Sequence, residues 1–269
     1  MLIRQVFIKV FVFATLATLA WQTNAQAQIV TEGLTHYWTL DKANIKGEVV
    51  EDSIGNNAGK IMGKPKIVAG KIGEALEFDG AVGNYVSLTP VDVLVNHSFT
   101  IQVWISLTEH AYNIAVSQGD AHSTNRYLHF GTHKDTHAFM FRFYGDDQDG
   151  GSLDLNKWYH LIGVYDKDKP EARLYVNGEN VANKAGSGGL KASTANSDFE
   201  IGVNYGRLGR ADWFHGIIDE VGIYDRALSE KEVKKNYSAE KGLMLDVTSA
   251  GKLSLTWGQI KDARVSSSN

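Results

Sequence analysis

Alternation of apolar and other residues with a period of two runs through most of this 269-residue chain, from about residue 34 to residue 226. In Phe99–Leu107 every odd-numbered residue is large and apolar, and Phe139–Tyr144 and Trp158–Tyr165 show related patterns. A period of two is that of a β-strand, in which successive side chains point to opposite faces. Many short strands without helical repeats between them predict a β-sandwich or barrel. The large side chains expected on the inner face include Trp38, Trp104 and Trp158.

Turn signals separate the expected strands. Asn177-Gly178 lies between two short strand-like runs, and Asn-Gly favours a two-residue hairpin because both central residues of a type I′ turn need positive φ.

One helix is expected near the C-terminal end of this region, over Ser229–Lys241. Ser229 is the expected N-cap, and Glu232, three residues later, completes a capping box. Leu228 and Val233 have the spacing of a hydrophobic staple, and Gly242 is placed to end the helix.

The first 27 residues have the features of an export signal. Arg4 and Lys9 provide the positive start, Val10–Ala20 is apolar or small, and Ala25–Ala27 is a small-x-small cleavage site. The apolar run is shorter than a membrane span requires, so a cleaved signal is preferred to an uncleaved anchor. We therefore expect a secreted, periplasmic or extracellular protein with no transmembrane span in its mature chain.

Composition limits the partners that the chain can bind and the groups that can stabilise it. The formal net charge is -4 and cleavage after Ala27 would remove two cations and no acid, which argues against nucleic acid as a partner. The chain has no Cys, so disulfides cannot stabilise it, and bound cations are one alternative.

A series of short motifs carries a family resemblance. They are Tyr37-Trp38-Thr39-Leu40-Asp41, Asp52-Ser53-Ile54-Gly55-Asn56, Gly73-Glu74-Ala75-Leu76-Glu77-Phe78-Asp79-Gly80, Phe99-Thr100-Ile101-Gln102-Val103-Trp104, Trp158-Tyr159-His160, Leu174-Tyr175-Val176-Asn177-Gly178 and Phe214-His215-Gly216-Ile217-Ile218-Asp219-Glu220-Val221-Gly222-Ile223-Tyr224-Asp225-Arg226-Ala227-Leu228-Ser229. In this order they resemble a laminin-G-like jelly-roll domain of the concanavalin A-like lectin/glucanase superfamily, over about residues 33–240. The resemblance implies an all-β, antiparallel jelly-roll sandwich with one short C-terminal helix. Residues 28–242 would form this domain, and 243–269 a tail that could be an edge strand, a linker or a sorting element.

The resemblance also implies a structural calcium ion. The matching positions are the Gly80 carbonyl and Asp219, with Asp79 as a further ligand and a carbonyl near Thr35 or His36 as a weaker one. The alternative is that the two aspartates cap turns. A second acidic segment, Asp146 to Asp149, does not fit the helix–loop–helix calcium template, and a solvated loop is preferred there.

A glycan or a glycosylated surface is the expected partner. Sugars are bound by aromatic faces and a few directional polar groups. The candidate carbohydrate-binding residues are Tyr127, His129, Arg142, Tyr144, His160 and Trp213. For each of them, ordinary packing or surface exposure is the alternative.

Known catalytic motifs are absent from the sequence. There is no Glu-x-Asp-x-x-Glu string of the laminarinase-type glucanases, no Gly-x-Ser-x-Gly elbow and no thiol. A non-enzymatic binding or adhesion module is therefore preferred. A polysaccharide lyase or glycoside hydrolase acting at the concave face, or a purely structural cell-surface assembly domain, remains an alternative.

Overall fold

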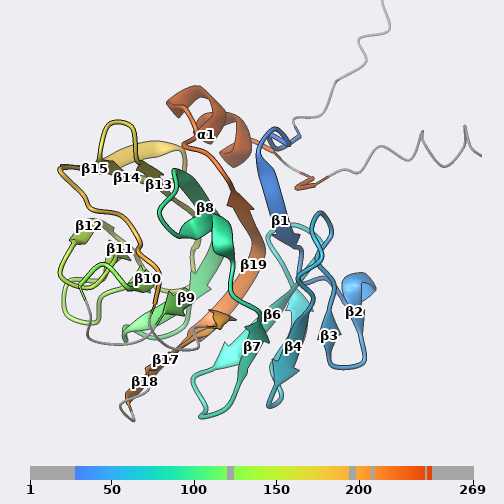
Figure 1. Cartoon of the computed structure of the whole chain (residues 1–269). Coiled ribbons are helices and arrows are strands. Elements are labelled where there is room, and N and C mark those ends of the chain that lie inside the picture. Colours follow the sequence, from blue (N-terminus) through green and yellow to red (C-terminus); the bar gives the residue numbers. More distant parts are fainter. Residues whose placement is uncertain (1–27, 120–123, 194–197, 207–209, 240, 244–269) are drawn as a thin grey trace, which may run out of the picture.

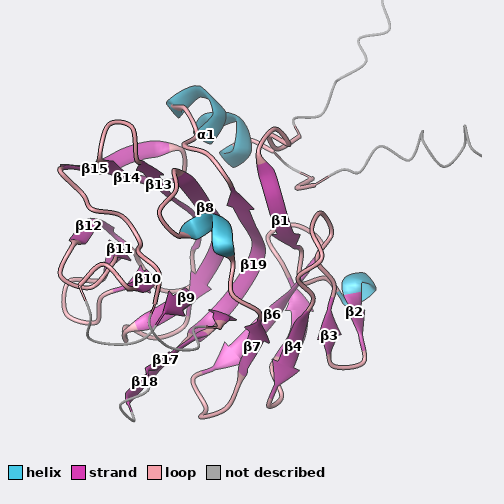
Figure 2. Cartoon of the chain, in the orientation of Figure 1, coloured by secondary structure: helices cyan, strands magenta, loops and turns pink. Residues whose placement is uncertain are grey.

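The computed structural model describes residues 28–119, 124–193, 198–206, 210–239 and 241–243. In this part of the chain, two antiparallel β-sheets pack face to face, and one short helix lies outside them (Figures 1 and 2). This confirms the predicted all-β sandwich. The expected signal at 1–27 and nearly all of the expected tail lie outside the described residues.

We call the sheet nearer the helix sheet I. In spatial order it contains β15 (Glu179–Ala185), β14 (Glu171–Val176), β13 (Trp158–Asp166), β8 (Phe99–Leu107), β19 (His215–Tyr224), β6 (Glu74–Asp79) and β5 (Lys66–Ala69), and β1 (Leu34–Trp38) pairs with β19. Strand β19 changes partner along its length: it pairs with β6 up to Ile218 and with β1 from Val221 onward. The change coincides with a bulge at Asp219–Gly222, where Glu220 has a φ of 54°.

The opposite sheet is sheet II. It contains β12 (Asp147–Ser152), β11 (Ala138–Arg142), β10 (Tyr127–Thr132), β9 (Asn113–Gly119), β16 (Phe199–Ile201), β7 (Tyr85–Leu88), β4 (Gly59–Met62), β3 (Val49–Val50) and β2 (Ile45–Lys46). Beside it stands a separate hairpin of β17 (Val203–Gly206) and β18 (Arg210–Trp213). Two 3-10 turns, η1 (Lys42–Asn44) and η2 (Asp92–Leu94), complete the connections.

The local turn and cap predictions are confirmed. Asn177 and Gly178 both have positive φ and join β14 to β15. The helix α1 (Glu230–Tyr237) has Ser229 as its N-cap, with a complete capping box to Glu232. The helix ends sooner than expected because the Ser238 hydroxyl donates to the carbonyls of the last turn, ahead of Gly242.

The core lies between the sheets and is formed mainly by alternate residues of the strands. All the odd-numbered residues of β8 belong to it, and Phe99 packs edge to face against Phe141 and Phe143 from sheet II. Trp38 lies in this core as predicted. The prediction for the other two tryptophans is wrong. Trp104 and Trp158 instead lie on the outer face of sheet I, where Trp104 is opposite His160 and Trp158 is opposite Ser106.

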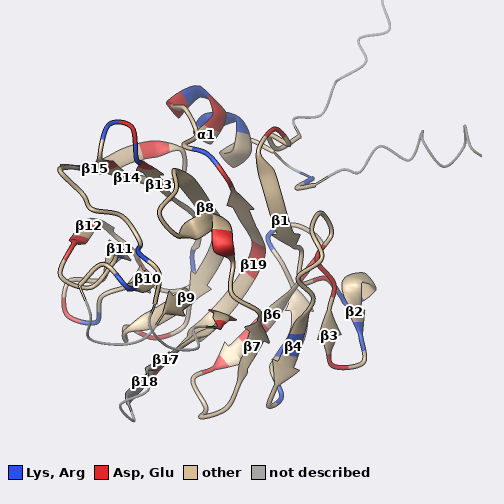
Figure 3. Cartoon of the chain, viewed as in Figure 1, with Lys and Arg blue, Asp and Glu red and all other residues tan. Residues whose placement is uncertain are grey.

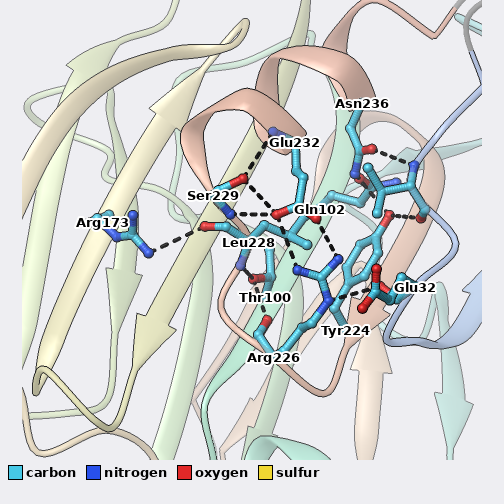
Figure 4. Close-up of polar contacts among 11 residues, drawn as sticks. Glu32, Thr100, Gln102, Arg173, Tyr224, Arg226, Leu228, Ser229, Glu232 and Asn236 are labelled. Atoms are coloured by element: carbon cyan, nitrogen blue, oxygen red, sulfur yellow. Dashed lines mark hydrogen bonds and ion pairs between the residues drawn. The ribbon is translucent and has the colours of Figure 1, made fainter.

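The outer face of sheet I is covered by α1 and the N-terminal segment (Figure 4). Asn236 of α1 donates to Gln102 Oε1 (2.7 Å) and to the Tyr224 hydroxyl (2.8 Å), and its own oxygen accepts from Val30 N (2.8 Å). Tyr224 in turn donates to the Val30 carbonyl (2.9 Å). These buried bonds tie the helix, the sheet and the N-terminal segment together.

Candidate functional site

A row of polar side chains crosses the outer face of sheet II. His129 on β10 lies opposite Arg142 on one side and Ser117 on the other, Ser117 lies opposite Glu200, and Arg142 lies opposite Asp147. Directly opposed residues in antiparallel strands share a face. Their neighbours along the central strands point the other way into the core, so this row faces outward. Two of the predicted sugar-binding residues, His129 and Arg142, are thus brought together.

The β17–β18 hairpin lies against β9 and borders this row. Asn204 on β17 approaches His129, with its Nδ2 3.2 Å from the imidazole Nε2. Ser117 donates to the Val203 carbonyl (2.9 Å), which fixes the base of the hairpin. Trp213 on β18 packs edge to face against Tyr85, with ring centroids 6.0 Å apart. The predicted Trp213 therefore lies beside the polar row, on the hairpin rather than on the sheet.

Two buried polar atoms in this region have no hydrogen-bond partner among the described residues. They are the hydroxyl of Tyr127, a side chain 4% exposed, and Oδ1 of Asn204, 6% exposed. The Tyr127 ring packs edge to face against His129, 4.3 Å between centroids. Burial, together with the charges of Glu200 and Asp212, raises the pKa of Tyr127 well above its usual value, so the hydroxyl stays protonated. Unsatisfied buried polar atoms are uncommon in folded proteins, and they mark places where a ligand or water supplies the missing bond.

Arg142 is held by Asp149. Arg142 Nε donates to Asp149 Oδ1 (2.6 Å), and Nη2 contacts Oδ2 of the same carboxylate. Burial lowers the pKa of Arg142, but the hydrogen bonds and charge of Asp149 outweigh it, and the net pKa is raised. The guanidinium is a fixed, charged donor whose fork is already paired.

The acidic segment differs from the solvated loop that was expected. Asp146 is buried and accepts from Lys184 Nζ (2.7 Å), Ser187 Oγ (2.8 Å) and Gly188 N (2.6 Å), while Asp147 and Asp149 belong to strand β12. Hydrogen bonds and ion pairs within the chain thus account for Asp146 and Asp149.

Two other predicted sugar-binding residues lie elsewhere. Tyr144 follows β11 in a tight turn, with a φ of 58°. His160 lies on the outer face of sheet I, 1% exposed, and stacks on Trp104 at 4.8 Å. Burial lowers the pKa of His160 to about 3, so its ring is neutral. The structure therefore separates His160 from the polar row, because the two residues are on different sheets.

The expected calcium ligands are not brought together. Asp79 lies opposite His215 in the β6–β19 pair, so Asp219 is four residues further along β19, roughly 13 Å away at the usual rise of a strand. Asp79 instead caps a turn, accepting from Ala81 N (3.0 Å) and Asn84 Nδ2 (2.7 Å). Gly80 N donates to the Phe214 carbonyl (3.0 Å) at the same end of the strand. In the described ranges, no group of three or more His, Asp or Glu side chains has the geometry to hold a metal ion.

A family model described as the concanavalin A-like lectin/glucanases superfamily matches residues 79–234. The chain belongs to this superfamily. A search of curated protein sequences finds no match to it.

Solved structures with the same concanavalin A-like fold are distant in sequence. Domain 4 of an extracellular GH43 arabinanase from Geobacillus stearothermophilus, in complex with arabinotriose, is 22% identical, covering 77% of this chain and 98% of that one, with a TM-score of 0.59. A Trypanosoma rangeli sialidase in complex with sialic acid is 20% identical over 79% of this chain, with a TM-score of 0.58. The chain spans only about a third of that sialidase, 34% of its length. The binding domain of Paraclostridial Mosquitocidal Protein 1 is 19% identical over 77% of this chain and 52% of that one, with a TM-score of 0.56.

In this concanavalin A-like domain, a group of buried acids that includes Asp219 lies at the β19 bulge. Asp219 Oδ2 accepts from Ile72 N (3.0 Å), whereas its Oδ1 is buried with no partner in the described part of the chain. Glu220 contacts the Tyr37 hydroxyl. Burial raises the pKa of Asp219 to about 8, with a contribution from the charge of Asp41. Burial and the neighbouring Asp219 raise the pKa of Glu220 to about 9. Both carboxyls are therefore protonated and uncharged at neutral pH unless a cation binds to them.

Sequence reasoning missed several residues of the polar face. Ser117, Glu200 and Asn204 come from segments that carry no motif. Glu200 had one usable signal, because it lies between the apolar Phe199 and Ile201 and so has the opposite parity in its strand.

None of the helices in the described part of the chain has the length and apolar character of a membrane span.

Proposed function

We propose that this chain is a non-catalytic carbohydrate-binding domain of an exported protein, and that its ligand lies on the outer face of sheet II. The observation that carries this proposal is the pair of buried, unpartnered polar atoms among the described residues, Tyr127 OH and Asn204 Oδ1, beside His129. Export rests on the signal-like segment 1–27. The arabinotriose complex of the similarly folded arabinanase domain supports a saccharide ligand.

Sugar hydroxyls have the chemistry that these atoms need. An amide oxygen needs a donor, and a phenol both donates and accepts, so a hydroxyl can bond to either one. Both side chains are buried and stand on β-strands, so ligand binding requires little reordering of side chains. Trp213 of the neighbouring hairpin and Tyr85 of β7 offer an aromatic pair beside the polar row.

Binding is better supported than catalysis. A lyase that used Tyr127 as its base would need a lowered phenol pKa, but the pKa of Tyr127 is raised. Arg142 is paired with Asp149 and is not free to neutralise an acidic sugar at the reacting centre. These features favour a site that holds a saccharide without cleaving it.

A glycan array probed with the full mature chain tests the proposal, with arabino-oligosaccharides among the first ligands. We expect reversible binding and unchanged ligand. Asn204→Ala should weaken binding, while Asn183→Ala, an exposed asparagine on β15 of sheet I, should not. Released oligosaccharide or an unsaturated product would make the chain an enzyme. Absence of binding to any glycan would favour a structural assembly domain.

We also propose that a calcium ion is bound near Asp219, with Asp41 as its neighbour, rather than with Asp79 and Gly80. Asp219 and Asp41 both contact the turn that joins β5 to β6: Asp219 accepts from Ile72 N, and Asp41 Oδ1 accepts from Glu74 N (2.6 Å). The unpartnered Asp219 Oδ1 fits a hard cation, which takes carboxylate and carbonyl oxygens together. Such an ion would tie the first strand region, this turn and the last strand together.

Thermal melting with calcium and with a chelator tests the ion. We expect calcium to raise the melting temperature of the parent protein, and Asp219→Asn to abolish the response. Asp79→Asn, at the turn where Asp79 caps Ala81, is the matched control and should keep the calcium response. A response lost in Asp79→Asn and kept in Asp219→Asn would reverse the assignment.

A further inference from the structure

A cleft lies on the outer face of sheet I, at the C-terminal end of α1. Its volume is about 460 Å³, within the usual range for small-molecule sites. It is lined by Lys71, Ile72, Trp104, Tyr237, Ser238 and Ala239. This cleft is on the opposite side of the sandwich from the polar row of sheet II, so it cannot be part of that site.

The base of the cleft is aromatic and rigid. Trp104 stacks on His160 with centroids 4.8 Å apart, and Tyr237 lies 5.8 Å from Trp104 and 6.1 Å from His160. Tyr237 is 39% exposed, so part of its ring is free to contact a ligand. His160 Nδ1 is buried and unpartnered in the described chain, and burial keeps the ring neutral. His160 therefore supports the aromatic base without adding charge.

The charge at the cleft comes from lysine. Lys71 Nζ lies 4.8 Å from the centre of the Trp104 ring. Its turn is fixed because Asp219 accepts from Ile72 N, the next residue. No acidic side chain lines this cleft among the described residues. Aromatic faces under a single ammonium group suit a ring-shaped ligand that carries negative charge.

A larger neighbouring cleft, of about 810 Å³, shares Ser238 with the first. Three lysines of α1 line it, namely Lys231, Lys234 and Lys235. Lys234 is paired with Glu230 (2.7 Å), and Figure 3 shows that α1 carries both basic and acidic residues. Its acidic lining residues are Glu32 and Glu232, and Glu232 is already bound by Arg226. The two clefts adjoin at Ser238, one lined by aromatic residues and the other by lysines, and together we call them the track.

We propose that this track is a second saccharide site and that it binds an acidic oligosaccharide. One sugar ring lies against Tyr237, its carboxylate faces Lys71, and the next carboxylates face the lysines of α1. Two sites on opposite faces make the domain bivalent, so it can link two glycan chains. The site is independent of the one on sheet II, and either can fail without the other.

Isothermal titration of the full mature chain with trigalacturonate tests this proposal. Its methyl ester, which has the same rings without the charges, is the comparison ligand. We expect the acid to bind and the ester to bind at least about tenfold more weakly, with an affinity that falls as salt rises. Equal affinities for acid and ester, or no binding of the acid at millimolar concentration, would overturn the proposal.

Variants locate the site. Tyr237→Ala should weaken binding of the acid about tenfold, the loss typical of an aromatic contact, and Lys71→Gln should weaken it several-fold. Lys169→Gln, with the same charge change on the β13–β14 turn, is the control and should bind normally. Melting curves check folding, and both cleft positions are exposed enough to tolerate substitution. Asn204→Ala should still bind the acid; loss in that variant, with none in Tyr237→Ala, would move the site to sheet II.

Discussion

The hydroxyl of Tyr127 allows a prediction in which stability and binding change in opposite directions. In Tyr127→Phe the unpartnered buried hydroxyl is removed and the ring is kept. A buried polar group without a partner costs about 1–3 kcal/mol, so the free energy of unfolding should rise by up to that amount. For a domain of this size, each kcal/mol raises the melting temperature by about 2–4 °C. Glycan binding should weaken about 5–10-fold, because one hydrogen bond to the ligand is lost.

Tyr224→Phe is the matched control on the opposite sheet. Its hydroxyl is also buried, but it donates to the Val30 carbonyl and accepts from Asn236 Nδ2. Removing it leaves those groups unsatisfied, so the same substitution should destabilise by about 1–3 kcal/mol and leave glycan binding unchanged. Denaturant unfolding measures the stability of the two variants, and titration with glycan measures their binding. If Tyr127→Phe were as destabilising as Tyr224→Phe, or bound glycan normally, the site assignment would be refuted.

Two further predictions concern the α1 anchor and the acid pair. Glu232→Gln removes the charge that pairs with Arg226, a contact that holds the pKa of Glu232 near 2. Because the pair is partly exposed to solvent, the substitution should lower the free energy of unfolding by up to about 1 kcal/mol in denaturant unfolding. An unchanged midpoint would mean that this pair contributes nothing. Asp219 and Glu220 have folded-state pKa values of about 8 and 9, above the ordinary values of 3.8 and 4.5. The folded state therefore binds more protons between these limits, and in chelator the melting temperature should fall as pH rises from about 4 to about 9. Added calcium should oppose that fall most strongly at high pH, and a chelated protein that gains stability over this range would contradict the raised pKa values.

The sequence by itself determined the features that depend on neighbouring residues. Strand parity in Phe99–Leu107, the Asn177-Gly178 hairpin and the capping box at Ser229 were all predictable, because the side-chain period and turn geometry act within a few residues. The ordered motifs also identified the family. For the binding face, the sequence predicted Tyr127, His129 and Arg142, on two strands that are consecutive in the chain and pair directly, and Trp213 on the neighbouring hairpin.

The tertiary structure decided which sheet faces are covered and which distant strands lie side by side. Ser117 meets Glu200 because β9 pairs with β16, 83 residues away in the chain, and no local pattern encodes that pairing. His160 and Trp104 have the parity of outward residues, yet packing beneath α1 buries them. Parity fixes the side of a sheet on which a residue lies, whereas its exposure depends on what packs above it. Asp219 and Asp79 lie apart for a related reason, because the register of β19 on β6 sets their separation along the strand.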